Sequence, residues 1–137
     1  MNKVFQETPK GCFRACVACI FSLDFWDVPE CFDAGAWNWG ECQLWLSSAT
    51  NTQAILIERQ KRLRENVLQI GWIVGESPLM ILGYTHPDDI NKPGHAVVGC
   101  VRDKEIVIIH DPSKSPNHRY GDLSRITMFV RFKHSAT

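Results

Sequence analysis

The sequence lacks an excess of charge of either sign, a long apolar run and any internal repeat. Among its 137 residues, 15 are lysine or arginine and 15 are aspartate or glutamate, so the formal net charge is zero. A neutral chain offers no electrostatic reason to bind nucleic acid or an anionic membrane. No apolar run approaches the roughly 20 residues that a membrane-spanning helix requires. We therefore expect no nucleic-acid partner and no membrane span.

The first ten residues, MNKVFQETPK, also lack the apolar stretch of a secretory signal peptide. We therefore expect a cytoplasmic protein, whose six cysteines serve as buried thiols, metal ligands or a nucleophile rather than as disulfides. The length and ordinary composition predict a single domain over residues 1–137. Nothing in the sequence specifies an oligomeric state.

The order of the expected elements indicates an α+β fold. From Cys12 to about Leu23 there is neither glycine nor proline, and the apolar spacing predicts a buried helix. A second helix is expected near Pro29 or after Gly40, ended by a polar break at residues 47–52. Strands are expected over residues 54–57, 71–78, 79–85, 95–101, 105–111 and 126–132, with a charged helical turn at 58–66 and a loop at 86–94. Helices followed by strands predict an antiparallel sheet.

Three cysteines, Cys12, Cys16 and Cys19, have the spacing C-x3-C-x2-C. This spacing occurs in loops that bind an iron–sulfur cluster, but such loops wrap the cluster and are not helical. The segment FRACVACIF has the pattern of a buried helix, so Cys16 and Cys19, like Cys100, are expected in the core. A zinc site at Cys31 and Cys42 with a histidine is the other alternative, and no C-x2-C pair accompanies these two residues. We expect no metal and no cofactor.

If only Cys12 reacts, it requires a helix start, a histidine and a group that orients the histidine. Gly11 gives a flexible entry to the helix, whose dipole and free N–H groups favour a thiolate at Cys12. His95 begins the strand HAVVGCV and Asp111 ends the strand EIVIIHD, so a hairpin brings them together as base and orienting carboxylate. Each also has a structural interpretation: core thiol, strand-end histidine, and turn residue before Pro112.

The hairpin hypothesis depends on the length of its turn. An odd-length turn centred on Asp103 places His95 directly opposite Asp111, on one face and with Cβ atoms roughly 4.5–5.5 Å apart. A two-residue turn shifts the register by one and moves Asp111 to the other face. His110 alternates with Asp111 and is expected to be structural.

Gln6 lies shortly before Cys12, and its side-chain N–H is a candidate donor to an oxyanion, together with the backbone N–H of Cys12. A surface role for Gln6 is the alternative. Substrate contacts are expected from Phe13, directly after Cys12, from Trp37 and Trp39 in GAWNWG, and from Gly94.

The motifs QETPKGCFRAC, GHAVVG and IIHDP, in this order, resemble the papain-like cysteine peptidases. The resemblance is closest to the domains that remove double-glycine leader peptides from bacteriocin precursors. It implies a papain-like fold with N-terminal helices on an antiparallel sheet, with Gln6 as oxyanion donor, Cys12 as nucleophile, His95 as general base and acid, and Asp111 as orienter. Many such domains have glycine where this chain has Phe13. They are also fused to transporters, so their substrate does not carry over.

The expected function is therefore a cysteine hydrolase, a peptidase or amidase that cleaves a peptide or amide bond through a thioester intermediate. Its partner is a peptide or protein substrate. Two alternatives remain open. One is a non-catalytic papain-like binding protein, such as an inhibitor or a phage counter-defence factor, and the other is a peptidoglycan amidase. Free-standing proteins of this pattern occur in bacteria and phages.

Overall fold

A computed structural model describes residues 2–58, 79–103, 105–114 and 119–132. Two α-helices come first in the chain, α1 (Cys12–Phe21) and α2 (Trp39–Thr50), with short 3-10 turns at Phe25–Asp27 and Glu30–Phe32 between them. Five strands follow: β1 (Thr52–Glu58), β2 (Met80–Tyr84), β3 (His95–Arg102), β4 (Glu105–His110) and β5 (Leu123–Arg131).

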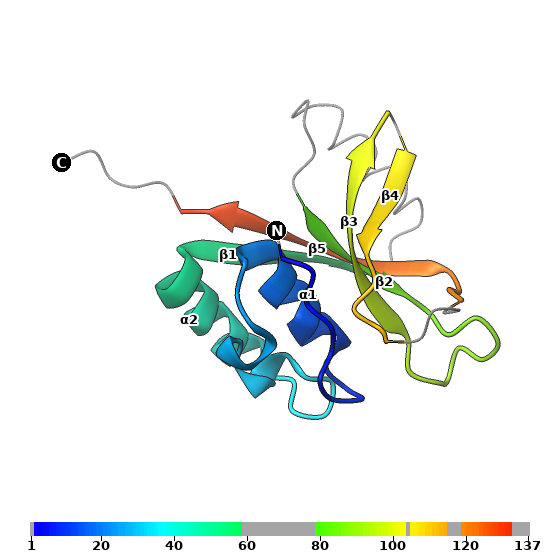
Figure 1. The fold of residues 1–137 in the computed structure, drawn as a ribbon, viewed down its shortest axis with the longest axis horizontal. Coiled ribbons are helices and arrows are strands. Elements are labelled where there is room, and N and C mark those ends of the chain that lie inside the picture. The colour runs from blue at the N-terminus through cyan, green and yellow to red at the C-terminus, as the bar shows by residue number, and fades with distance from the viewer. Residues whose placement is uncertain (1, 59–78, 104, 115–118, 133–137) are drawn as a thin grey trace.

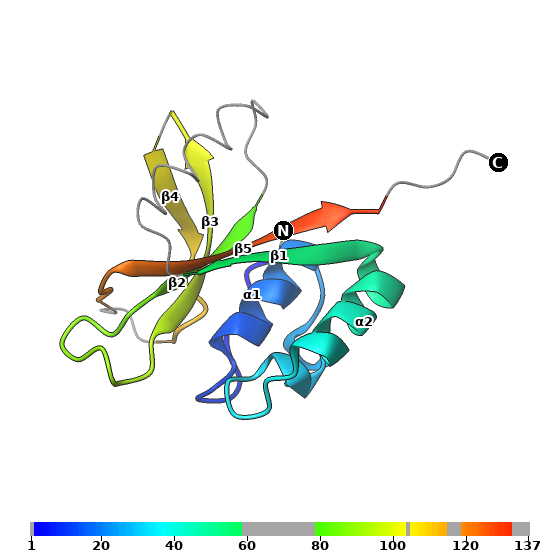
Figure 2. The same cartoon turned by 180° about the vertical axis from the view of Figure 1, so that it is seen from behind.

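The five strands form one sheet in the order β1-β5-β2-β3-β4, and every neighbouring pair is antiparallel. The helices lie together on one side of the long strands β1 and β5 (Figure 1), and the view from behind shows the same arrangement (Figure 2). The expectation of an α+β fold, with N-terminal helices packed on an antiparallel sheet, is confirmed. None of the described helices is long and apolar enough to cross a membrane.

The main core lies between the helices and the sheet, where α1 packs on β3 and β2 and α2 packs on β1. Its buried members come from both layers, with Cys16, Val17 and Cys19 on α1 and Ile81 and Val98 on the sheet. A second buried cluster includes Met80, Leu82, Val97, Val101 and Ile126. Alternation along β2 and β3 sends successive side chains to these two clusters, as expected for strands buried on both faces.

Helix α1 follows the prediction closely, and it ends where Ser22 adopts a left-handed conformation, with φ of 56°. The predicted polar break at residues 47–52 is wrong, because α2 continues to Thr50. The hydroxyl groups of Ser48 and Thr50 donate to the carbonyls of Leu44 and Leu46, at 3.1 and 2.7 Å. Their polar groups are thus satisfied within the helix, and Asn51, with φ of 54°, ends it.

The strands expected at 54–57, 79–85, 95–101, 105–111 and 126–132 all correspond to strands of the sheet. The expected loop at 86–94 contains no strand or helix. The predicted strand at 71–78 and nearly all of the charged helical turn at 58–66 lie outside the described residues.

The turn between β3 and β4 is the two-residue alternative and not the odd-length turn that the hairpin hypothesis required. Arg102 pairs with Glu105, so two positions, not an odd number, separate the paired residues. The register then shifts between Val98 and Gly99, where a β-bulge pairs Val98 with His110. One extra residue in one strand moves the following side chains by one position. The bulge therefore reverses the effect of the short turn and returns Asp111 to the face of His95.

Arg14 fixes the segment between the two helices, although it is a charged residue with only 6% exposure. Its Nε donates to the carbonyl of Val28 at 2.6 Å, and a terminal nitrogen lies 3.2 Å from the Asp33 carboxylate. The guanidinium also lies over the ring of Phe25, 4.5 Å from its centroid. A buried charge requires this kind of pairing, and the result holds the segment that leads to Trp37 against α1.

Candidate active site

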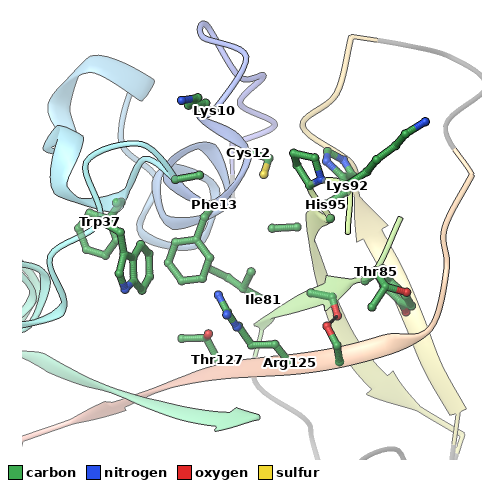
Figure 3. Close-up of a pocket in the computed structure, with 18 of the residues that line it drawn as sticks. Lys10, Cys12, Phe13, Trp37, Ile81, Thr85, Lys92, His95, Arg125 and Thr127 are labelled. Carbon is green, nitrogen blue, oxygen red and sulfur yellow. Dashed lines mark hydrogen bonds between the residues drawn. The ribbon is translucent and has the colours of Figure 1, made fainter. Parts of the chain in front are cut away.

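Cys12 is the first residue of α1 and lines a cleft of about 510 Å³ between the helices and the sheet (Figure 3). Gly11 is the N-cap and has no side chain that could occupy the free N–H groups of the first turn. These groups and the helix dipole favour an anion at this position. Of the six cysteines, Cys12 alone is partly exposed, so it is the thiol that a ligand in the cleft can reach.

The surroundings of Cys12 favour its thiolate. Burial alone would raise the pKa of the thiol. A hydrogen bond with the His95 side chain, the backbone N–H of Ala96, the charge of His95 and the backbone N–H of Phe13 oppose burial and lower the pKa from its ordinary value of 9.0. Since the thiolate is the nucleophilic form of cysteine, this site favours reactivity at a pH where an ordinary thiol is protonated.

His95 connects the thiol to Asp111. Its Nε2 lies 2.5 Å from Oδ1 of Asp111, and the two side chains are only 10% and 21% exposed. An ionised carboxylate can only accept, so Nε2 carries the proton and donates it. Nδ1 is then the ring nitrogen left for Cys12, whose hydrogen bond with His95 also raises the pKa of the imidazole. Cys12, His95 and Asp111 therefore form one hydrogen-bonded chain.

The pKa values of the two residues on the sheet change in directions that favour ions. Burial alone would lower the pKa of His95, but hydrogen bonds to Cys12 and Asp111 and the charge of Asp111 raise it above 6.5. Burial alone would raise the pKa of Asp111, but hydrogen bonds from His95, Tyr120 and the Ser113 backbone N–H lower it below 3.8. The arrangement favours a thiolate, an imidazolium and a carboxylate in series.

Tyr120 is a fourth member of this network that the sequence analysis missed. Its hydroxyl donates to Oδ2 of Asp111, and its ring stacks on that of His95, with centroids 6.3 Å apart and planes 9° apart. Burial and the Asp111 carboxylate raise the pKa of Tyr120 well above 10, so it remains a donor. No motif or periodicity marks this residue, because it lies in a segment without regular structure that only the fold brings back to Asp111.

Gln6 is close to this network through its backbone, because its N–H donates to the carbonyl of Pro112 at 2.9 Å. Its side-chain Nε2 donates to the carbonyls of Thr8 and Pro9, at 3.1 and 3.5 Å. In this structure the amide is therefore bonded within the N-terminal segment. An oxyanion role for Gln6 requires the amide to turn from these carbonyls toward the cleft.

Three of the four predicted substrate-binding residues line the cleft, and the fourth lies behind them. Phe13, Trp37 and Gly94 line the cleft, and Phe13 meets Trp37 edge to face, with ring centroids 5.1 Å apart. Trp39 is absent from the lining and stacks behind Trp37 at 5.5 Å. Gly94 has a steric reason to be glycine, since a Cβ there would lie 2.3 Å from the carbonyl oxygen of Tyr84.

The remaining thiols are packed in the protein interior. Cys16 and Cys19 are fully buried, as predicted, and burial raises the pKa of both. Cys100 is also buried. Cys31 and Cys42 have sulfur atoms 3.6 Å apart, and burial raises the pKa of Cys42 to about 12. Among the residues that the structure describes, no three His, Cys, Asp or Glu side chains are arranged to hold a metal ion.

His110 points away from this network, as the alternation along β4 predicts. It is buried, and its Nε2 lies 2.7 Å from the carbonyl oxygen of Val4. The imidazole ring also meets Phe5 edge to face. His110 thus attaches the N-terminal segment to β4, which is a structural role.

Comparison with known proteins adds no relative to this description. No protein-family model, no curated protein sequence and no solved structure matches the chain.

Proposed function

We propose that this protein is a papain-like cysteine hydrolase that cleaves a peptide or amide bond. The observation that carries the proposal is the hydrogen-bonded series of Cys12, His95 and Asp111 in a cleft. Helix α1 and the β3–β4 hairpin, which are far apart in the sequence, supply these residues, and a helix start holds the thiol. This is the arrangement that nucleophilic catalysis requires: a nucleophile, a base in contact with it, and a third group that orients the base.

The first half of the reaction forms a thioester. The Cys12 thiolate attacks the carbonyl carbon of the substrate, and the carbonyl electrons move to the oxygen. The imidazolium of His95 donates its Nδ1 proton to the leaving nitrogen as the C–N bond breaks, and the amine departs. Asp111 holds the ring by its Nε2–H throughout and stabilises its positive charge.

The second half releases the acid. Neutral His95 takes a proton from a water molecule, whose oxygen attacks the thioester carbon. The C–S bond then breaks, the carboxylic acid departs, and the thiolate and imidazolium are restored. In both halves the negative oxygen needs donors, and the backbone N–H of Cys12 at the helix start is the first candidate. The Gln6 amide is the second, after the reorientation described above.

The proposal is tested by alkylation of Cys12 with iodoacetamide across pH, followed site by site by peptide mass spectrometry. Cys12 should react faster than the five buried cysteines and reach half its maximal rate below pH 9.0, because its pKa is lowered. In His95→Ala the midpoint should move to higher pH. Burial then raises the pKa of Cys12 without the opposing hydrogen bond and charge of His95. Cys100→Ser, at a buried thiol outside the cleft, is the matched control and should leave the Cys12 profile unchanged.

Turnover is tested separately with a library of blocked peptides and chromatographic detection of fragments. Cleavage that disappears in Cys12→Ala and persists in Cys100→Ser is the expected result. Equal alkylation of all six thiols would contradict the proposal, and so would a pH profile of Cys12 alkylation that is unchanged in His95→Ala. A reactive Cys12 with no peptide cleaved would instead favour a binding protein built on the same scaffold.

A further inference from the structure

The cleft beside Cys12 is basic, although the whole chain is neutral. Lys10, Lys92 and Arg125 line it, and no aspartate or glutamate is among its described lining residues. The walls are apolar, with Phe13, Phe32, Trp37 and Ile81 among them. A concave site with apolar walls and a few convergent polar groups selects ligands by those groups, and here they are cationic.

Arg125 occupies the part of the cleft below Phe13 and Ile81 (Figure 3). It pairs in the sheet with Gly83, and a Cβ on Gly83 would lie 3.1 Å from Cβ and 3.8 Å from Cδ of Arg125. Because Gly83 has no side chain, the aliphatic part of Arg125 can lie against the backbone of Gly83. Glu58, the cross-strand neighbour on β1, is 3.2 Å from the guanidinium, but the Arg125 side chain remains 43% exposed. A guanidinium has five donors, so one partner leaves others available.

Thr127 lies two residues along β5 from Arg125 and therefore on the same face. It lines the cleft, is 0% exposed, and has a buried hydroxyl oxygen without a hydrogen-bond partner. Figure 3 shows its hydroxyl directed toward the same part of the cleft as Arg125. Buried polar groups are normally paired. An unpaired hydroxyl beside an available guanidinium indicates a ligand oxygen as the missing partner.

We infer that the substrate carries a side-chain carboxylate near the scissile bond, bound by Arg125 and Thr127. A carboxylate can accept two parallel hydrogen bonds from a guanidinium and a further one from a hydroxyl. Lys10 and Lys92 add attraction to an acidic segment. This inference rests on the proposed function, because a peptide hydrolase needs a peptide, and it narrows the class to peptides with glutamate or aspartate beside the cleaved bond.

The test measures binding without cleavage. In the full chain carrying Cys12→Ser, blocked hexapeptides that differ at one central position, Glu, Gln, Lys or phosphoserine, are titrated and followed by NMR chemical shifts. The Glu peptide should bind roughly 3- to 10-fold more tightly than the isosteric Gln peptide, since the guanidinium is only partly buried. The difference should shrink as ionic strength rises.

Matched variants locate the preference. Arg125→Gln should abolish it, whereas Arg131→Gln, an exposed arginine of the same strand outside the cleft, should retain it. Glu58→Gln should strengthen binding of the Glu peptide, because it removes the competing carboxylate. Thr127→Val should weaken that binding without lowering the melting temperature, because it removes an unpaired buried hydroxyl. If Arg125→Gln does not fold, Arg125→Lys keeps the charge and should retain part of the preference.

Several results would overturn the inference: equal affinity for the Glu and Gln peptides, a Glu preference that survives Arg125→Gln, no binding of any peptide, or tighter binding of phosphoserine than of Glu. All are measured on a protein without the nucleophile. They are therefore separate from failure of the proposed hydrolase, which shows as an unreactive Cys12 in the alkylation experiment.

Discussion

At the scale of single residues, the site depends on how one carboxylate is held. Asp111 accepts hydrogen bonds from His95, from the Tyr120 hydroxyl and from the backbone N–H of Ser113, the last at 2.8 Å. Three donors leave the carboxylate one orientation and hold it ionised, with its pKa lowered. The Tyr120 hydroxyl donates to Asp111, so Tyr120 would act through that carboxylate as a positioning residue.

Tyr120→Phe should reduce the maximal rate of Cys12 alkylation or peptide cleavage by roughly 10-fold, as expected for the loss of one hydrogen bond to a charged group. It should also move the acid limb of the pH–rate profile to higher pH. That limb reports the Cys12 thiol, whose pKa is lowered by His95. Asp111 without one of its three donors orients His95 less firmly, so the pKa of Cys12 is lowered less. The measurement is the pH–rate profile of both proteins.

The control for this variant is Tyr84→Phe. Tyr84 packs against Tyr120, with ring centroids 5.1 Å apart, but it is not among the hydrogen-bond donors to Asp111 that the described residues show. The acid limb should stay in place in this protein. A Tyr120→Phe profile that changes only in height, with its acid limb unmoved, would mean that Tyr120 contributes packing alone.

At the scale of elements, the β3–β4 hairpin decides whether the site exists. Its two-residue connection alone would direct Asp111 away from His95, and the bulge at Val98–Gly99 corrects this. Gly99 also allows the strands to approach closely, since a Cβ there would lie 2.4 Å from Leu82 Cδ1 and 2.9 Å from the Val107 carbonyl oxygen. The packing of this hairpin, and with it the geometry of the candidate site, therefore depends on Gly99.

Gly99→Ala should lower the free energy of unfolding by about 1–3 kcal/mol, because an added methyl group must displace neighbours in a packed sheet. Gly40→Ala is the matched control. That glycine lies in the first turn of α2, its Cβ would meet only Asn38 Oδ1 at 3.5 Å, and alanine favours helix. Urea unfolding curves of both variants provide the comparison. Equal stability of the two proteins would show that the hairpin tolerates a side chain at this position.

The same elements show what the sequence could and could not predict. Local patterns located α1 and the described strands, and the helix start, the strand start and the Asp-Pro strand end identified Cys12, His95 and Asp111. The register between β3 and β4 could not be predicted, because no local pattern marks the bulge at Val98–Gly99 and the approach of Leu82 to Gly99 is a tertiary contact. Residues 47–50 were misassigned because their polar side chains bond within the helix. Tyr120 was missed because its contact with Asp111 is tertiary.

At the scale of the whole molecule, the site joins two layers. Cys12 belongs to the helical layer, whereas His95 and Asp111 belong to the sheet. Arg14 and its partners fix the helical side, and β5, which lies between β1 and β2, holds the sheet together. The properties of Cys12 should therefore depend on the docking of the layers and not on α1 alone.

In a urea titration, the fast alkylation of Cys12 at neutral pH should disappear in the same transition as the circular dichroism signal of the fold. Beyond that transition, all six cysteines should react at similar rates, because burial and the His95 hydrogen bond are lost together. The measurement is alkylation at each thiol at a series of urea concentrations. Loss of Cys12 reactivity well before the circular dichroism transition would show that the layers separate while each remains folded.

The position of β5 in the sheet has a consequence for the protein during its synthesis. A ribosome releases Cys12 early, but β1 and β2 have no strand between them until Leu123–Arg131 has emerged. Until then the imidazole has no fixed place beside the sulfur, and a nascent chain carries only an ordinary thiol. The proposed nucleophile would thus gain its lowered pKa only after β5 has been synthesised and has joined the sheet.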